Sequence, residues 1–314
     1  MQILSEGRGH LSKKNEGVQL FWDATSLKLL KACPRMYHYS QLCGWRFKSE
    51  SHHLTFGTLF HKGGEYYQAE RLRGVPHVDA AETTVSKLLI ESADWHSLDN
   101  AKNRENLIRS VVWYLEEYKD HPLKIVRLPN GKPATELSFR LQLPTTLDGE
   151  ETFICGHLDE VCELENGSRF ILDKKTTGGA LGQRFFSSFS PDIQMTTYIY
   201  AGNIILPMPI SGLLVDAAQI LVGSTRFARA FVHRTKAQLE EYIEELNIWL
   251  NLAFGFAKAK NWPANETACG NYGECPFRRI CSRDPGVRDS FLASDFELNP
   301  WNPLVEKGIE TSDA

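Results

Sequence analysis

The sequence has no segment that would span a membrane or direct secretion. Its 314 residues include no run approaching about 18 consecutive apolar residues, the length that a membrane-spanning helix needs. The first residues, Met1–Lys14, hold no apolar core of the kind that secretory signals carry. Internal repeats and low-complexity segments are missing as well. These absences favour a cytoplasmic protein without a membrane partner.

Charge of one sign is not in marked excess either, since the formal net charge is −4. The segment 285–314 alone holds six acidic and two basic residues, so residues 1–284 are neutral overall. A neutral body neither indicates nor excludes a nucleic-acid partner. We expect one domain over residues 21–284, a flexible polar arm over 1–20 and a weakly ordered acidic tail over 285–314.

Apolar periodicity predicts helices in the first part of the domain and strands in its middle. Apolar residues recur at helical spacing over residues 57–73, 77–95 and 102–120. Strand patterns cover residues 137–143, 152–164, 169–174, 212–222 and 227–234. Two more helices are expected, one at 191–205 capped by Ser190 and one from the capping box Thr235–Gln238 to about residue 260. This order predicts an α/β fold with a mixed central sheet flanked by helices.

Three charged residues lie near the facing ends of two predicted strands. Asp159 stands on the first strand, and Asp173 and Lys175 stand two apart on the second, so that these two share a face. Two carboxylates and an ammonium group can fix a divalent cation, orient a water molecule and hydrolyse a phosphodiester. The alternative is a solvated polar hairpin whose acidic residues take part in no reaction.

The length of the turn between the two strands decides whether these groups can meet. A two-residue Asn166–Gly167 turn would place Asp159 opposite Lys174. A three-residue loop that ends at Gly167 in a left-handed conformation would place Asp159 opposite Asp173 instead. A phosphodiesterase site therefore requires the three-residue loop.

Four short motifs follow one another along the chain. In order they are Gly57-Thr-x-x-His61, Gly156-x-x-Asp159, the segment Phe170 to Thr176, and Gln194-x-x-x-Tyr198. Together they resemble the core of RecB-like nucleases of the PD-(D/E)XK superfamily, including the CRISPR-associated exonucleases. The resemblance covers residues 27 to 281, most of the chain.

The resemblance implies a restriction-endonuclease-like core and a role for each matching residue. His61, Asp159, Asp173 and the backbone carbonyl of Lys174 would bind Mg²⁺ or Mn²⁺, and Lys175 would orient or activate the water. Gln194 and Tyr198 would orient Lys175 or a substrate phosphate. Glu136, at the start of a predicted strand, would support a ligand or a second metal ion.

Four of the seven cysteines have the arrangement of a metal site. Cys269, Cys275 and Cys281 follow the last long helix, and Cys33 lies far upstream in a Cys-Pro-Arg context. Thiolates select zinc or an iron–sulfur cluster. By resemblance to the same nucleases, the four would hold a [4Fe-4S] cluster that joins the N- and C-terminal segments.

Other interpretations of the cysteines stay open. The Cys269–Cys275 gap is longer than the family's usual two residues, so Zn²⁺ remains an alternative metal, although a Cys-x2-Cys knuckle is missing. Four reduced, buried core thiols are the other alternative. The remaining three are expected to be core or incidental thiols: Cys43, Cys155 and Cys162.

Basic and aromatic residues near both motifs suggest contacts to DNA. Arg184 and Phe185 follow the predicted catalytic strand and could stack on unpaired bases, unless the phenyl ring caps the core of the sheet. Arg35 and Arg278 lie beside the cysteines in sequence and would contact phosphates if the metal cluster forms; ordinary surface arginines are the alternative.

The resemblance implies a metal-dependent DNA nuclease, an exonuclease that acts on DNA ends or single-stranded DNA. The setting would be recombination, repair, or CRISPR or phage DNA processing, with a separate helicase, recombinase or CRISPR adaptation protein as partner. The alternative is a catalytically inactive, metal-stapled nucleic-acid-binding or adaptor module. The complete set of Asp159, Asp173 and Lys175 argues against that alternative.

Overall fold

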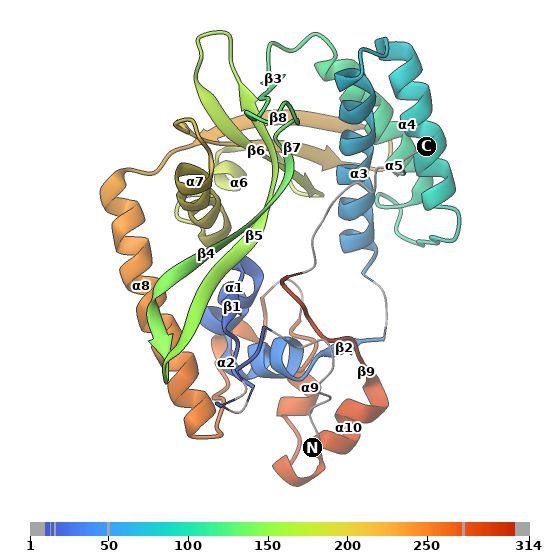
Figure 1. Cartoon of the computed structure of the whole chain (residues 1–314). Coiled ribbons are helices and arrows are strands. Elements are labelled where there is room, and N and C mark those ends of the chain that lie inside the picture. The colour runs from blue at the N-terminus through green and yellow to red at the C-terminus, as the bar shows by residue number, and fades with distance from the viewer. Residues whose placement is uncertain (1–9, 13, 16, 49–50, 272–273, 305–314) are drawn as a thin grey trace. The chain divides into compact units, whose positions relative to one another are not determined.

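The computed structural model describes residues 10–12, 14–15, 17–48, 51–271 and 274–304. The chain divides into two compact units (Figure 1). The first unit consists of residues 1–49, 138–157 and 235–314, and the second consists of residues 50–137 and 158–234.

A mixed sheet forms the centre of the second unit. Its strands are β3 (Lys124–Ile125), β5 (Glu150–Glu163), β6 (Arg169–Thr177), β7 (Gly212–Ile220) and β8 (Thr225–Val232). β6 pairs with β7 in parallel, whereas β3–β5, β5–β6 and β7–β8 are antiparallel pairs. All nine residues of β7 are buried, as expected of a central strand that is covered on both faces.

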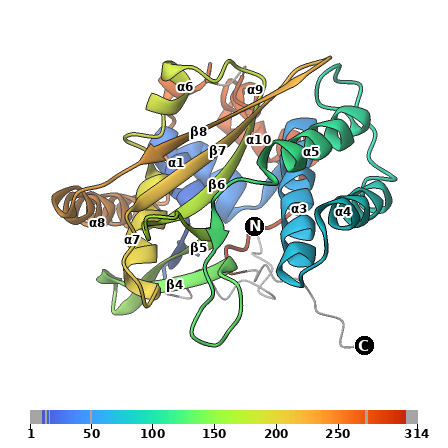
Figure 2. The same ribbon diagram turned by 90° about the horizontal axis from the view of Figure 1, so that it is seen from above.

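Helices cover both faces of this sheet. The parallel connection from β6 to β7 passes through α6 (Gln183–Ser187) and α7 (Ile193–Ile205). On the opposite side lie α3 (His52–Leu72), α4 (His77–Glu91) and α5 (Arg104–Tyr118), as Figure 2 shows. Phe56, Leu88 and Leu107 of these three helices form one buried core with Ala218 and Ile220 of β7. The predicted α/β fold with a mixed sheet between helices is confirmed.

The first unit contains the remaining elements. Strand β1 (Phe21–Trp22) runs parallel to the start of β5, and β4 (Thr135–Leu147) pairs with β5. Residues 135–137 of β4 belong to the second unit, whereas residues 150–157 of β5 belong to this first unit. Its helices are α1 (Ala24–Ala32), α2 (Pro34–Tyr37), the π-helical turn η1 (His38–Leu42), α8 (Lys236–Lys258), α9 (Arg278–Cys281) and α10 (Arg288–Asp295), with 3-10 turns η2 (Glu266–Ala268) and η3 (Pro285–Val287). Strands β2 (Trp45–Phe47) and β9 (Phe296–Leu298) form a separate antiparallel pair.

The structure differs from the sequence-based expectation at both ends of the chain. The predicted acidic tail includes α10 and β9, where Leu292 and Phe296 are buried and Phe296 stacks on Phe277 at 4.8 Å between ring centroids. Within the predicted flexible arm, Leu11 and Gln19 form a β-bridge and both are buried. Residues 1–9 and 305–314 of these two segments lie outside the described residues.

Two helix starts lie near the predicted ones. The capping box of Thr235 and Gln238 begins α8 as predicted. Helix α7 begins two residues late, at Ile193, because the carboxylate of Asp192 and not the hydroxyl of Ser190 accepts a hydrogen bond from a free N–H group of the first turn, that of Met195, at 3.1 Å.

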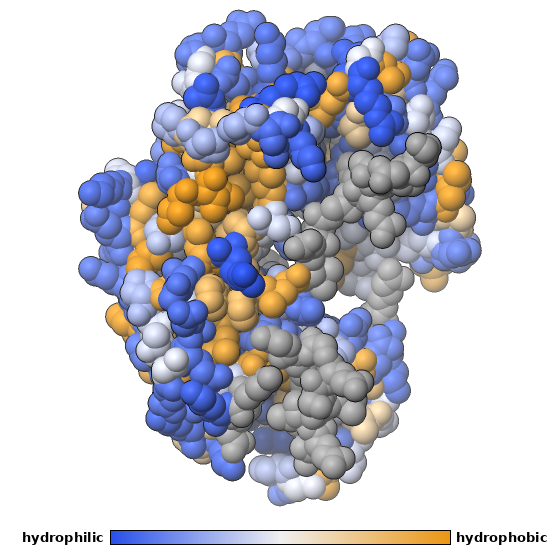
Figure 3. Space-filling model, in the orientation of Figure 1, coloured by the Kyte–Doolittle hydropathy of each residue, from blue (hydrophilic) through white to orange (hydrophobic). Residues whose placement is uncertain are grey.

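Among the described residues, no helix is both long enough and apolar enough to cross a membrane. Helix α7 is the clearest apolar helix, and apolar side chains gather over it on the face drawn in Figure 3. It has 13 residues, fewer than the about 20 that a span needs.

Candidate active site

The register of the β5–β6 hairpin brings two carboxylates together. The Leu164 N–H donates to the Ser168 carbonyl at 2.9 Å, which leaves a three-residue loop, and the loop ends at Gly167 with φ +81°. Strand pairs run from Glu163–Arg169 to Glu160–Leu172, and the same register places Asp159 opposite Asp173. The three-residue loop predicted for a phosphodiesterase site is confirmed.

Helix α7 meets Asp173 and Lys175 on one face of β6. Lys175 Nζ lies 2.7 Å from Asp173 Oδ2 and donates to Gln194 Oε1 at 3.2 Å. Gln194 Nε2 in turn lies within 3.4 Å of Asp173 Oδ1 and 3.1 Å of the Tyr198 hydroxyl. Gln194 and Tyr198 can both reach the site because a spacing of four places them on one face of the helix.

Asp159 receives its contacts from the backbone of β6 and from α3. The Lys174 N–H donates to Asp159 Oδ2 at 3.2 Å, and His61 Nδ1 lies 3.3 Å from the same oxygen. The structure thus brings His61, Asp159, Asp173 and Lys175 into one cluster within the second unit.

Burial and charge act differently on the two carboxyl groups. Burial alone would raise the pKa of Asp159, but His61, Lys174 and Lys175 hold that pKa well below its usual range. Burial raises the pKa of Asp173, and although Lys175 opposes this, the charge of Asp159 adds to it and the pKa stays above its ordinary value. Asp173 is therefore the harder of the two carboxyl groups to ionise.

The cluster has the donor set and the charge that suit a divalent cation. Two carboxylates face one ammonium group, so one negative charge is in excess when His61 is neutral. Asp173 Oδ2 is buried and accepts no hydrogen bond of normal geometry, although Lys175 lies beside it. Carboxylate oxygens are the ligands that Mg²⁺ and Mn²⁺ prefer. Asp159 and Asp173 offer such ligands and His61 adds an imidazole nitrogen, although no choice of one ligand atom from each places all three within 4.8 Å of one another.

A second row of charges lies on the opposite face of the same strands. Lys174 forms an ion pair with Glu160 and pairs across the strands with Asp216, which in turn binds Arg229 at 2.8 Å. Burial alone would lower the pKa of Lys174, but Glu160 and Asp159 raise it above its ordinary value, so the side chain stays charged. The row alternates in sign across β5, β6, β7 and β8: Glu160, Lys174, Asp216 and Arg229.

This row connects the sheet to the helix that carries His61. A Cβ atom at Gly64 of α3 would lie 2.9 Å from Lys174 Cε, so the lysine stem packs directly on the helix backbone. Gly64 follows His61 by three residues, which is about one turn. Glu160, Lys174 and Arg229 also line a cavity of about 50 Å³ together with Tyr67, Tyr114 and Tyr118.

Sequence reasoning missed Glu160 and Asp216. Glu160 shares one face of its strand with the apolar residues Leu158 and Cys162, and Asp216 stands between Val215 and Ala217 in an apolar strand. A charged residue at such a position needs a buried partner of opposite sign, and that requirement was the available signal.

Three other predicted residues remain predictions. Glu136 is the second residue of β4 and has φ +48°, which is unusual for a residue with a side chain. Arg184 is exposed on α6, and Phe185 is half-buried against Phe186 and Phe189 at 5.1 and 5.2 Å between ring centroids. The ring of Phe185 is thus part of a small aromatic cluster.

The four cysteines predicted to bind metal all belong to the first unit, but no three of them place their sulfur atoms within 4.8 Å of one another. Burial raises the pKa of Cys275, and the nearby thiol groups of Cys269, Cys281 and Cys33 add to this. The Asn265 N–H donates to Cys33 Sγ at 3.3 Å. Two predicted arginines lie beside this group: Arg35 donates a hydrogen bond to Cys281, whereas Arg278 is exposed and lies 3.6 Å from Glu274.

The remaining cysteines are buried elsewhere. The Cys155 thiol donates to the Trp22 carbonyl at 3.4 Å, and the Cys162 thiol donates to the Phe170 carbonyl at 3.5 Å. Cys43 is buried beside His38. All seven cysteines are free of disulfides. These three are core thiols, one of the two alternatives expected for them.

Comparison with known proteins identifies a family whose model matches most of the chain. The model of the PD-(D/E)XK nuclease superfamily matches residues 22–282. A solved structure of a provisionally assigned exonuclease from Eubacterium rectale shares 12% identity with this chain, covers 90% of it and 94% of its own length, and has a TM-score of 0.51. At that identity the likeness shows the fold alone.

A second solved structure, named SSO0001, shares 14% identity, covers 87% of this chain and 88% of its own, and has a TM-score of 0.39. A likeness this low carries no argument. No curated protein matches the chain.

We predict that Glu160→Leu destabilises the protein by about 3–5 kcal/mol, because it leaves the buried Lys174 ammonium group without its partner. The double variant Glu160→Leu/Lys174→Met should recover most of this loss, since it removes both charges and keeps the volume filled. Urea unfolding measures both changes. Equal stability of the single and double variants would show that the two residues do not act as a pair.

Proposed function

The chain belongs to the PD-(D/E)XK nuclease superfamily, and from that membership we propose that it is a divalent-metal-dependent deoxyribonuclease. One observation carries the proposal more than any other. The hairpin register sets Asp159 opposite Asp173, and Lys175 contacts Asp173 at 2.7 Å, so both carboxylates and the ammonium group of the proposed reaction come from neighbouring positions of two paired strands.

Each residue of the cluster has a proposed role. Asp159, Asp173, His61 and the Lys174 carbonyl would hold Mg²⁺ or Mn²⁺. Such an ion supplies Lewis acidity, which makes a water molecule more acidic and neutralises charge on the phosphate. Lys175 would then turn from Asp173 to the reacting groups, where its ammonium group orients the water and stabilises the negative charge that develops on the phosphate.

Gln194 and Tyr198 act through Lys175. The Gln194 side chain bridges Lys175, Asp173 and Tyr198 by hydrogen bonds, so it holds the ammonium group at the carboxylate that would bind metal. In the proposed reaction the water oxygen bonds to phosphorus and the bond from phosphorus to the 3′-oxygen breaks. The products would be a 5′-phosphate and a 3′-hydroxyl group; the attacking water releases a proton to solvent, and the 3′-oxygen takes one up from solvent.

The substrate that we propose is DNA with a free end or a single-stranded portion. The name of the similar Eubacterium rectale protein, an exonuclease by provisional assignment, supports exonuclease action. Arg184, exposed on α6, and Phe185 follow the proposed catalytic strand and would contact the strand being cleaved. The reaction would serve recombination, repair, or CRISPR or phage DNA processing in the cytoplasm, beside a separate helicase, recombinase or CRISPR adaptation protein.

We further propose that Cys33, Cys269, Cys275 and Cys281 hold a [4Fe-4S] cluster, with Zn²⁺ as the alternative. Cys33 is far from the other three in sequence, yet its thiol adds by charge to burial in raising the pKa values of Cys275 and Cys281, which supports the proposal. Arg35, which donates to Cys281, would offset the negative charge of thiolate ligands. Such a site would stabilise the first unit, since metal binding and folding are coupled.

The nuclease proposal predicts that Asp173→Ala and Lys175→Ala each lower cleavage at least about 100-fold, because each removes a group that stabilises the transition state. End-labelled single- and double-stranded DNA, with Mn²⁺ or with EDTA, measures the rate, and the product ladder gives the polarity. Lys236→Ala is the matched control, since this lysine is 91% exposed on α8. A folded chain that binds DNA but cleaves none with Mn²⁺ would support the inactive adaptor instead.

The cysteine proposal predicts about four iron atoms per chain and visible absorbance after anaerobic purification. Cys275→Ser should lose this metal, whereas Cys162→Ala, at a buried thiol of the second unit, should retain it. A colourless chain that holds one zinc ion would select the alternative metal. Unchanged metal content in Cys275→Ser would contradict both.

A further inference from the structure

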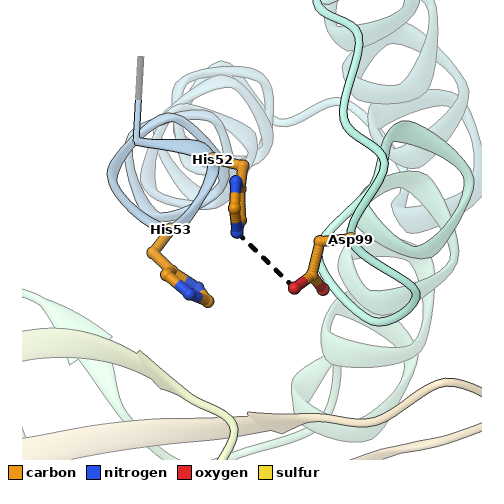
Figure 4. Close-up of side chains that lie close together, drawn as sticks. All are labelled: His52, His53 and Asp99. Carbon is orange, nitrogen blue, oxygen red and sulfur yellow. Dashed lines mark ion pairs between the residues drawn. The ribbon is translucent and has the colours of Figure 1, made fainter. Parts of the chain in front are cut away.

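A separate group of ligand side chains lies at the first turn of α3. His52 and His53 begin this helix, and Asp99 lies in the segment between α4 and α5 (Figure 4). One ligand atom from each residue lies within 4.8 Å of the other two. All three belong to the second unit, and the motifs of the proposed nuclease site include none of them.

The Asp99 carboxylate is held in place by the backbone that follows it. Its Oδ1 atom accepts hydrogen bonds from the N–H groups of Ala101 at 2.8 Å and Lys102 at 2.6 Å. Hydrogen bonds of this kind favour the ionised carboxylate. They also direct Oδ2 toward His52 Nε2, which lies 3.5 Å away (Figure 4).

We propose that His52, His53 and Asp99 bind a Zn²⁺ ion that joins the first turn of α3 to the segment before α5. Two ligand atoms, each at about 2.1 Å from zinc and at a tetrahedral angle, are about 3.4 Å apart. The 3.5 Å between His52 and Asp99 matches that spacing. Two imidazoles and one carboxylate leave at least one position for water, and imidazole favours Zn²⁺ over Mg²⁺.

This ion would be distinct from the proposed catalytic one. His52 precedes His61 by nine residues on the same helix, which corresponds to about 13 Å along its axis. The Zn²⁺ ion would therefore stabilise the start of α3 and take no part in the reaction. The inference does not depend on the proposed nuclease activity.

Two features limit the affinity of the site. The Lys102 side chain acts on His53 by charge and would repel a cation, as would the positive end of the α3 dipole. His53 is also exposed, so binding it costs the imidazole its side-chain freedom. We therefore expect weaker binding than at a closed zinc site with four protein ligands.

Zinc content can be compared in a chain whose proposed catalytic site is disabled. In an Asp173→Ala background, equilibrium dialysis against Zn²⁺ should show one ion fewer per chain for His52→Ala and for Asp99→Ala. The matched control is His96→Ala, at an exposed histidine three residues before Asp99, and it should bind as much Zn²⁺ as its parent. Equal zinc content in all four chains would overturn the proposal.

A second measurement does not depend on how the variants fold. Anomalous scattering at the zinc edge, from a crystal of the Asp173→Ala chain soaked in Zn²⁺, should show a peak among the three side chains. A soaked crystal with no peak there would also overturn the proposal. Loss of nuclease activity in the wild-type chain affects neither result, so the two proposals fail independently.

Discussion

Two buried carboxylates face each other across the β5–β6 hairpin, and their mutual repulsion constrains the rest of the second unit. Asp159 and Asp173 meet because the loop has three residues and ends in a left-handed glycine, Gly167. The ammonium group of Lys175 on the same strand as Asp173 offsets part of the repulsion, and the imidazole of His61 on α3 lies against Asp159. One negative charge remains, and a divalent cation would neutralise it. A buried, charged site of this kind is expected where function, not stability, determines the residues.

The opposite face of the strands supports this arrangement. Lys174 follows Asp173 along β6, and its N–H group binds Asp159 while its side chain binds Glu160. Because the Lys174 stem packs on Gly64, it also sets the distance of α3 from the sheet. The position of His61, on the same helix, depends on that distance. Buried ion pairs contribute little net stability, but they penalise any other register, since a shift would leave one charge unpaired.

Local sequence patterns predicted much of the candidate site. They predicted little of the row of buried charges on the opposite face of the strands. Period-two spacing placed Asp173 and Lys175 on one face, and a spacing of four placed Gln194 and Tyr198 on one side of a helix. Glu160 and Asp216 escaped prediction because their partners come from other strands, and pairing across strands is not a local property. The folded segment with Leu292 and Phe296 was missed for a related reason, since its acidic composition concealed two core residues. His52 and Asp99 are likewise brought together only by the packing of α3 against the segment before α5.

Thermal unfolding with EDTA or with Mn²⁺ tests the central claim most directly, in the wild-type chain and in Asp173→Asn. If the two carboxylates repel each other and together bind the cation, Asp173→Asn should raise the metal-free midpoint by about 2–4 °C, the shift that corresponds to about 1 kcal/mol in a protein of this size class. It should also remove the stabilisation that Mn²⁺ gives the wild-type chain. A lower metal-free midpoint for Asp173→Asn, together with an undiminished response to Mn²⁺, would contradict the account.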